Sequence, residues 1–340
     1  MIIKVSSGIA AMTSGRFAKS LRRMSTPASH GALRTSYAAP LATLVILTLA
    51  VAAFSPSFVK PRSLVITADA AAPILLLALG ETIVILLGSI DLSLNAIASL
   101  SSVAAAMLLD ETGRWAVPLG VAVGIGCGLF NGLVYTGARI PSFIATLGTL
   151  GIWTGISLTV SGARPVPIPE HDGLFGWIAG DLLGFPNTAL LGITAVASTF
   201  VILRYTPLGR YIYAIGIGEP ATWLSGVAVQ RHKIMAFALA GGCAGLAGMV
   251  LTAQLSSGGP SIANNLLLPA IAAVIVGGTA ITGGVGGVLR TLIGALIIIV
   301  ARIGMDAAGV NVFAQQVVYG GIVILAVTLT IDRTKILTIK

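Results

Sequence analysis

About ten apolar runs follow one another between residues 38 and 331, and they limit what this chain can fold into more than any other feature. The chain is 56% hydrophobic and only 9% charged, whereas soluble domains carry about 25% charged residues. A soluble protein of this size needs more polar surface than the sequence supplies. We therefore predict an all-α, polytopic integral membrane protein. The expected spans lie near 38–57, 70–88, 92–109, 116–136, 143–161, 187–204, 234–254, 267–278, 288–305 and 312–331.

Several of these runs are short for a membrane span. A helix needs about 20 residues to cross a bilayer, and the run at 267–278 is well below that length. Some of the ten helices are therefore expected to be tilted, broken or re-entrant. The predicted organisation is a basic tail over 1–37, one transmembrane domain over 38–333 and a short tail over 334–340.

The basic residues predict the orientation. Ten spans place both termini on one side, and 15 of the 20 Lys and Arg residues fall on that side, with four opposite and Arg302 inside a span. Cytoplasmic loops carry such an excess, so both termini are predicted to be cytoplasmic. This orientation accounts for the net charge of +9, and no nucleic-acid partner is expected. The loop 162–186 then lies outside, and 205–233 is the longest cytoplasmic loop.

Glycine recurs every fourth residue in the run 116–136, at Gly120, Gly124, Gly128 and Gly132. Such spacing places the four glycines on one face of a helix. Small residues let helix backbones approach closely in membranes, so tight packing is the favoured interpretation. Lining of a pore is the alternative.

Motifs for covalent or nucleotide chemistry are missing from the sequence. No Gly-Lys dipeptide occurs, which excludes a P-loop, and no G-x-S-x-G, C-x-x-C or H-E-x-x-H motif is present. The three histidines show no metal-ligand spacing. The chain is therefore predicted not to be an enzyme and to bind no metal or cofactor itself.

Asp91 lies within an apolar stretch, "LLGSIDLSLN", that also contains small and polar residues. An ionisable residue at membrane depth requires partners or water, so it is a functional candidate. Asp, Ser and Asn favour caps and turns because their side chains bond the local backbone. Asp91 is therefore predicted to cap the next helix by accepting N–H bonds from residues such as Ser93 or Leu94. Direct contact with solute hydroxyls is the alternative, and both roles can coexist at a broken helix.

A short helix is predicted inside the loop 205–233. Glu219 and Pro220 suit the first turn of a helix, and Gly226 would end it after about two turns. Such a helix is either a docking element or an ordinary interfacial helix. A second break in an apolar run occurs at "VIVGGTAITGGVGGVLRTLIGALII".

Four segments resemble the permease subunits of ribose-type carbohydrate ATP-binding-cassette (ABC) importers. They are "GSIDLSLNAIASL", "ARIPSFIATLGTLGIWTGISLTVSGARPV", "TPLGRYIYAIGIGEPATWLSGVAVQRHKIMAF" and "LPAIAAVIVGGTAITGGVGGVLRTLIGALII". They occur in the family's order within residues 40–333. Glu81, where the family usually has an apolar residue, and Trp223, where it usually has Arg, depart from the pattern.

The resemblance implies a type II-like ABC importer permease fold in the bacterial inner membrane. Its implied partners are a cytoplasmic ATP-binding subunit carrying ATP and Mg, an extracytoplasmic solute-binding protein, a second permease copy or related permease, and lipid. The solute would be a sugar, polyol or similar hydroxyl-rich molecule. The residues expected to couple to the ATPase are Glu219, Ala221, Leu224, Ser225 and Gly226. Those expected along the translocation pathway are Glu81, Asp91, Ser93, Asn95, Thr146, Gly278 and Thr279.

Two other functions remain open from the sequence. A permease of the same superfamily could carry nucleosides or branched-chain amino acids. An ion-coupled secondary transporter could use Glu81 and Asp91 to carry protons. Dependence on ATP rather than on a proton gradient would separate the second of these from an importer.

Overall fold

The computed structural model describes residues 37–169 and 173–330, so residues 1–36 of the predicted tail over 1–37 and the whole predicted tail over 334–340 lie outside the described residues. Residues 40–340 form one compact unit, and the arrangement discussed below is that of its described part. The long helices are α3 (Ala38–Phe54), α4 (Pro61–Leu86), α5 (Leu94–Thr112), α6 (Ala116–Ala138), α7 (Ser142–Ser161), α9 (Asn187–Tyr205), α10 (Pro207–Leu224), α11 (Val229–Leu255), α13 (Val288–Ala307) and α14 (Val312–Thr330). The short ones are η1 (Pro56–Val59), η2 (Gly113–Trp115), α8 (Gly173–Ala179), η3 (Asn264–Leu266) and α12 (Leu267–Val276).

Six described stretches are long and apolar enough to cross a membrane by length and composition. One of them, Leu94–Ala138, contains two helices, α5 and α6. Three shorter apolar helices accompany them, at Ala38–Phe54, Asn264–Val276 and Val312–Thr328. Each predicted apolar run thus coincides with a helix, but the count of about ten membrane spans stays a prediction.

Two helices begin earlier than the apolar pattern predicted. The α4 helix begins at Pro61 rather than near 70, and α11 begins at Val229 rather than near 234. Both early segments carry charged residues, such as Arg62 and Lys233. Charged side chains end an apolar run, but they favour helix as well as most apolar ones do, so the backbone continues helical.

The glycine stripe of α6 packs tightly against α11, as predicted. A Cβ atom at Gly124 would lie 2.5 Å from the Gly241 carbonyl oxygen, and one at Gly128 would lie closer still to that of Phe237. No real Cβ atom approaches a backbone oxygen so closely, so only glycine permits this contact. The α6 and α11 helices share the most extensive contact between elements in the described part of the chain. This finding confirms helix packing over pore lining for these glycines.

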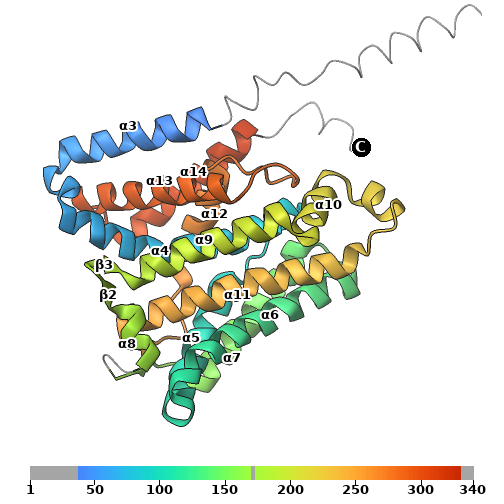
Figure 1. The fold of residues 1–340 in the computed structure, drawn as a ribbon, viewed down its shortest axis with the longest axis horizontal. Helices are drawn as coiled ribbons and strands as arrows, with labels where there is room; N and C mark the ends of the chain where they lie inside the picture. Colours follow the sequence, from blue (N-terminus) through green and yellow to red (C-terminus); the bar gives the residue numbers. More distant parts are fainter. Residues whose placement is uncertain (1–36, 170–172, 331–340) are drawn as a thin grey trace, which may run out of the picture. The chain divides into compact units, whose positions relative to one another are not determined.

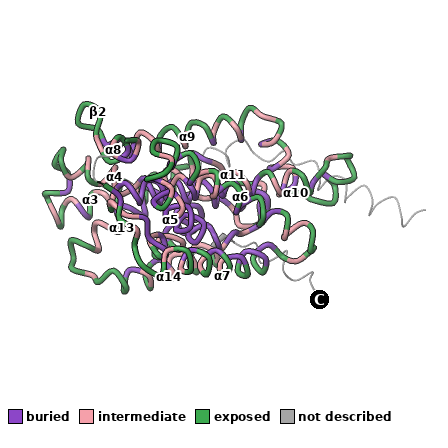
Figure 2. The backbone as a smooth tube through the Cα atoms, turned by 90° about the horizontal axis from the view of Figure 1, so that it is seen from below, coloured by how far each residue is buried: buried purple, intermediate pink, exposed green. Residues whose placement is uncertain are grey.

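Helices α4, α5 and α11 form the core. Their central segments are almost continuously buried, and α11 packs against α4, α5 and α6. Figure 2 shows buried backbone around α5 and α11 and mainly exposed positions on the peripheral helices. The exposed side chains of α3, α6 and α7 are largely apolar, as expected for helices that face lipid.

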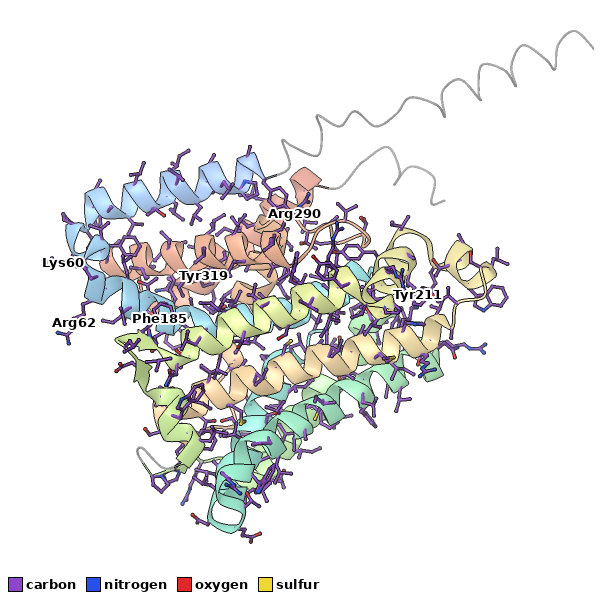
Figure 3. All side chains as sticks on the ribbon, viewed as in Figure 1. Lys60, Arg62, Phe185, Tyr211, Arg290 and Tyr319 are labelled. Carbon is purple, nitrogen blue, oxygen red and sulfur yellow. The ribbon has the colours of Figure 1, made fainter. Side chains whose placement is uncertain are left out.

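The bundle has two distinct ends. Figure 1 shows α8, β2 (Asp181–Leu182) and β3 (Phe185–Pro186) at one end, which we call the α8 end, and α10 at the other, the α10 end. Lys60 and Arg62 lie at the α8 end and Tyr211 at the α10 end (Figure 3). Two small antiparallel pairs complete the fold. They are β2 with β3, and β1 (Val166–Pro167) with β4 (Ser257–Gly258).

Candidate functional site

A break between α4 and α5 holds Asp91 in the protein interior. The backbone turns at Gly88, whose φ of +75° favours glycine, and the Asp91 side chain is fully buried. Its Oδ1 accepts hydrogen bonds from the Ser93 N–H (2.8 Å) and the Ser93 hydroxyl (2.7 Å). Its Oδ2 accepts one from Asn131 Nδ2 at 3.1 Å. Both carboxylate oxygens therefore have partners, which offsets the cost of burial.

The predicted capping role is only partly correct. The hydrogen bond from the Ser93 N–H is present, but the N-cap position of α5 is Ser93, and no side chain caps that helix. Asp91 therefore stabilises the turn before α5 rather than the helix's first turn. The physical reason is that two further residues, Leu92 and Ser93, remain non-helical before α5 begins.

Side chains of α6 and α7 hold the same break from the other side. Asn131 Nδ2 also donates to the Ser93 hydroxyl at 2.7 Å, and Asn131 Oδ1 accepts from Trp153 Nε1 at 3.2 Å. The backbone N–H of Leu92 donates to Thr146 Oγ1 at 3.0 Å. That of Ile90 donates to Ser142 Oγ at 3.1 Å. Side chains thus satisfy backbone donors that the break leaves outside the helical ladder.

Glu81 and Asn95 differ from Asp91, because their oxygens lack partners. Both carboxyl oxygens of Glu81 and the Oδ1 of Asn95 are buried and accept no hydrogen bond from the described residues. Asp91 acts on Glu81 in two ways: its carboxylate repels the Glu81 charge, and its backbone N–H lies near enough to stabilise that charge without a well-aligned hydrogen bond. An unpaired buried polar group costs about 1–3 kcal/mol. These oxygens are therefore the ones beside the break that water or a bound solute would satisfy.

Gly278 and Thr279 belong to a second break, between α12 and α13. Gly278 has a φ of +94°, and its carbonyl accepts from Arg290 Nη1 at 2.8 Å. Thr279 Oγ1 accepts from the Gly287 N–H at 3.3 Å, which closes the loop. Within the described residues, no hydrogen bond joins either residue to Asp91 or its partners. The structure thus groups Asp91, Ser93 and Thr146 and places Gly278 and Thr279 in a separate turn.

Four glycines join the two breaks to α10, and we call them the glycine junction: Gly88, Gly216, Gly283 and Gly284. The Gly284 N–H donates to the Leu86 carbonyl at 2.9 Å. A Cβ atom at Gly216 of α10 would overlap the Leu86 oxygen, and one at Gly283 would lie 2.6 Å from the Gly88 nitrogen. These contacts pack the backbone of α10 directly against the backbone of both breaks.

The loop 205–233 contains more helix than predicted. Instead of a short helix over 219–226, α10 runs from Pro207 to Leu224, with a kink at Gly218. Thr206 caps its start by accepting from the Gly209 N–H, which the sequence pattern did not reveal. Only the part after the kink corresponds to the prediction. Gly226 follows with a φ of +83° and turns the chain toward α11.

Glu219 is already bound within the protein. Lys233 Nζ donates to both of its carboxylate oxygens at 2.7 Å, and the same ammonium lies 4.6 Å from the centre of the Tyr135 ring. The Tyr135 hydroxyl accepts from Ser89 at 3.2 Å. A continuous path of side chains therefore leads from the kinked helix to the residue beside Ile90 in the first break.

The other predicted coupling residues are exposed at the α10 end. Ala221, Leu224, Ser225 and Gly226 all face away from the protein, together with Trp223. Leu224 is 77% exposed and Trp223 66%. We call Ala221–Ser225 the α10 tip. Its shape is fixed by Thr222, whose hydroxyl donates to the carbonyls of Ala214 and Gly218 at 2.9 Å each.

Sequence reasoning missed Asn131, Trp153, Ser142, Tyr135 and Lys233. One signal was available for Asn131, because it is the one amide side chain in the apolar run 116–136. The others act through tertiary contacts that no local pattern records. Within the described residues, no group of three or more His, Cys, Asp or Glu side chains could hold a metal ion.

Comparison with known proteins matches residues 63–327 to a family described as "Branched-chain amino acid transport system / permease component". The chain is 39% identical over 299 residues to the ribose import permease protein RbsC of Bacillus subtilis (strain 168), covering 87% of this chain and 92% of that protein. It is 36% identical over 293 residues to RbsC of Escherichia coli (strain K12), covering 84% and 91%. It is 35% identical to the D-allose transport system permease protein AlsC of E. coli (strain K12), covering 75% and 78%. No solved structure matches the chain.

Proposed function

The chain belongs to the family of branched-chain amino acid transport system permease components, and from that premise we propose that it is the membrane-spanning subunit of an ATP-driven sugar importer. The solute is a sugar, polyol or similar hydroxyl-rich molecule. The observation that carries this proposal is the identity of 35–39% to permeases named for ribose and allose, over three quarters or more of the chain. The family's description keeps a branched-chain amino acid as the second candidate solute.

The geometry supports transport by alternating access. A cytoplasmic ATPase subunit binds ATP and Mg and pushes on the α10 tip. The glycine junction and the path from Glu219 through Lys233 and Tyr135 carry that displacement to the two breaks. The first break then opens first to one side of the membrane and then to the other. The unpaired oxygens of Glu81 and Asn95 accept hydrogen bonds from the solute there.

The partners follow from this role. A solute-binding protein delivers the solute at the α8 end, and the ATPase docks at the α10 end. A second copy of this chain or a related permease completes the pore between them. The protein lies in the bacterial inner membrane with both termini in the cytoplasm, and ATP hydrolysis resides in the partner.

ATP hydrolysis by the assembled transporter tests the function. The chain is purified with its co-expressed ATPase and binding protein and reconstituted in lipid nanodiscs. We expect neutral sugars or polyols such as D-ribose, D-allose or ribitol to stimulate hydrolysis, and L-leucine to leave it at the basal rate. Stimulation by leucine alone would favour the amino acid alternative. Uptake driven by a proton gradient without ATP would show that the protein is a secondary transporter and not an ATP-driven importer.

Cysteine labelling tests the orientation. Leu183 is fully exposed in the turn between β2 and β3, and Gln230 is exposed beside the α10 tip. After the native Cys127 and Cys243 are replaced by Ala, Leu183→Cys should react with a membrane-impermeant thiol reagent on intact cells. Gln230→Cys should react only after permeabilisation. The reverse pattern would overturn the proposed orientation.

A further inference from the structure

A second polar site lies away from both breaks, in a cavity of about 290 Å³ at the α8 end. Helices α4, α11, η3, α12, α13 and α14 surround it, and its lining includes the last turns of α11 and α13 and the first turns of α14. Its polar lining residues are Gln254, Asn265, Arg302, Gln315, Gln316 and Tyr319. Figure 3 shows Tyr319 on the side of the bundle formed by α13 and α14.

Two groups in this cavity can donate hydrogen bonds without losing a protein partner. Arg302 forms no ion pair or hydrogen bond with the described residues, and the nearby Asp306 instead accepts from Gln315 at 2.6 Å. The hydroxyl of Tyr319 is buried without a partner in the same part of the chain. A guanidinium inside a membrane span is costly unless it meets water or polar groups. Water or a polar ligand in the cavity would meet the Arg302 guanidinium.

The glutamine residues supply acceptors, because protein carbonyls occupy their amide nitrogens. Pro73 has no N–H for the Asp69 carbonyl, and Gln254 Nε2 donates to that oxygen instead at 2.9 Å. Gln316 Nε2 donates to the Asn265 carbonyl at 3.1 Å. These bonds fix the amide orientations. The amide oxygens accept no hydrogen bond from the described residues and remain available to a ligand.

We propose that this cavity binds a neutral, hydroxyl-rich solute before it reaches the breaks. A hydroxyl group both donates and accepts, so a sugar or polyol matches a lining that mixes donors with amide oxygens. A carboxylate or phosphate group only accepts hydrogen bonds and would leave the amide oxygens unpaired. An apolar side chain would leave both the donors and the amide oxygens unpaired. The inference rests on the proposed function and adds an entry site to it.

Protection of an engineered thiol tests the site without requiring transport. Ala70→Cys, in α4, places a small thiol in the lining after Cys127 and Cys243 are replaced by Ala. The transporter in nanodiscs is treated with a small methanethiosulfonate reagent in the presence of D-ribose, D-allose, ribitol, inorganic phosphate or L-leucine. We expect a neutral sugar or polyol to slow modification, and inorganic phosphate and leucine to have little effect.

Two variants identify the binding groups. Tyr319→Phe removes a hydroxyl that has no partner among the described residues, so it should leave folding intact, and Arg302→Gln removes the guanidinium. Each should raise the half-protecting solute concentration about tenfold. Tyr205→Phe and Arg204→Gln, exposed at the α10 end, are the matched controls and should change nothing.

Three results would overturn the site. The first is a thiol that never reacts, as expected if a second copy fills the cavity. The second is protection by leucine or inorganic phosphate rather than by polyols. The third is protection that is unchanged in both variants. The proposed function is judged separately, by solute-stimulated ATP hydrolysis of the transporter with native Ala70. Solute-stimulated ATP hydrolysis without protection of the engineered thiol would contradict the entry site and leave the proposed importer function intact.

Discussion

Replacing Asp91 by Leu is expected to abolish transport, whereas Asp91→Asn should retain part of it. The Asp91 carboxylate accepts three hydrogen bonds, two from Ser93 and one from Asn131. Leucine accepts none, so three buried donors lose their acceptor, at about 1–3 kcal/mol each. Asparagine keeps one acceptor oxygen and nearly the same shape. Solute uptake by cells, normalised to the amount of protein in the membrane, measures the difference.

The control is Asp110→Leu, at an exposed position near the end of α5. It removes a carboxylate from the helix that follows the first break without touching Ser93 or Asn131, so it should transport normally. Thermal unfolding of the purified variants shows whether Asp91→Leu acts through folding. If Asn and Leu are equally inactive while both proteins are as stable as wild type, the charge of Asp91 is required, and its role is not confined to the turn.

The polar turn at Asp91 was predictable from the sequence because the signal is local. A carboxylate followed two residues later by serine, inside an apolar run, favours a side-chain bond to the backbone in any context. The partners from α6 and α7 could not be predicted, because Asn131 and Trp153 reach the break only after three helices have packed. Thr146 was expected along the translocation pathway from the family resemblance, but the hydrogen bond that it accepts from the Leu92 N–H is a tertiary contact that the local sequence does not predict.

Helix positions were predictable to a similar extent. Apolar runs located every long helix except α10, because that helix lies in a loop rich in charged and small residues. The spacing of Gly120, Gly124, Gly128 and Gly132 predicted a tight contact on its own, since a four-residue repeat lines up the glycines along one helix face. Which helix would fill that groove was not predictable, because the glycines of α11 occur at several spacings.

A charge placed on the α10 tip is expected to abolish coupling between this chain and the ATPase subunit. The tip is rigid, because Thr222 bonds it to the first part of α10 and Lys233 holds Glu219. Its apolar side chains are nevertheless exposed, and an ordered apolar surface without a partner marks a docking site. Ala221→Asp places a carboxylate on that surface. Loss of one central contact costs about 2 kcal/mol, or roughly thirtyfold in affinity for the ATPase subunit.

Gly226→Val tests the same docking through the backbone. Gly226 has a φ of +83°, which a β-branched residue adopts only with strain, so the chain reversal after the tip should shift. Apart from Gly226 and its two chain neighbours, no atom of the described residues lies within 4 Å of the position that a Cβ would take, so the expected effect comes from backbone strain. Both variants should leave the membrane helices folded. Solute-stimulated ATP hydrolysis should be lost, and the ATPase subunit should dissociate during purification.

The matched control is Ala138→Asp, which places the same charge on an exposed residue at the α10 end of α6, outside the tip. It should keep the ATPase bound and the stimulation intact. A control that fails as badly as Ala221→Asp would mean that any added negative charge at this end disrupts the complex. Normal coupling in both Ala221→Asp and Gly226→Val would mean that the tip does not contact the ATPase. The glycine junction would then transmit motion from some other surface, since Gly216 connects the breaks to α10 regardless of what binds the tip.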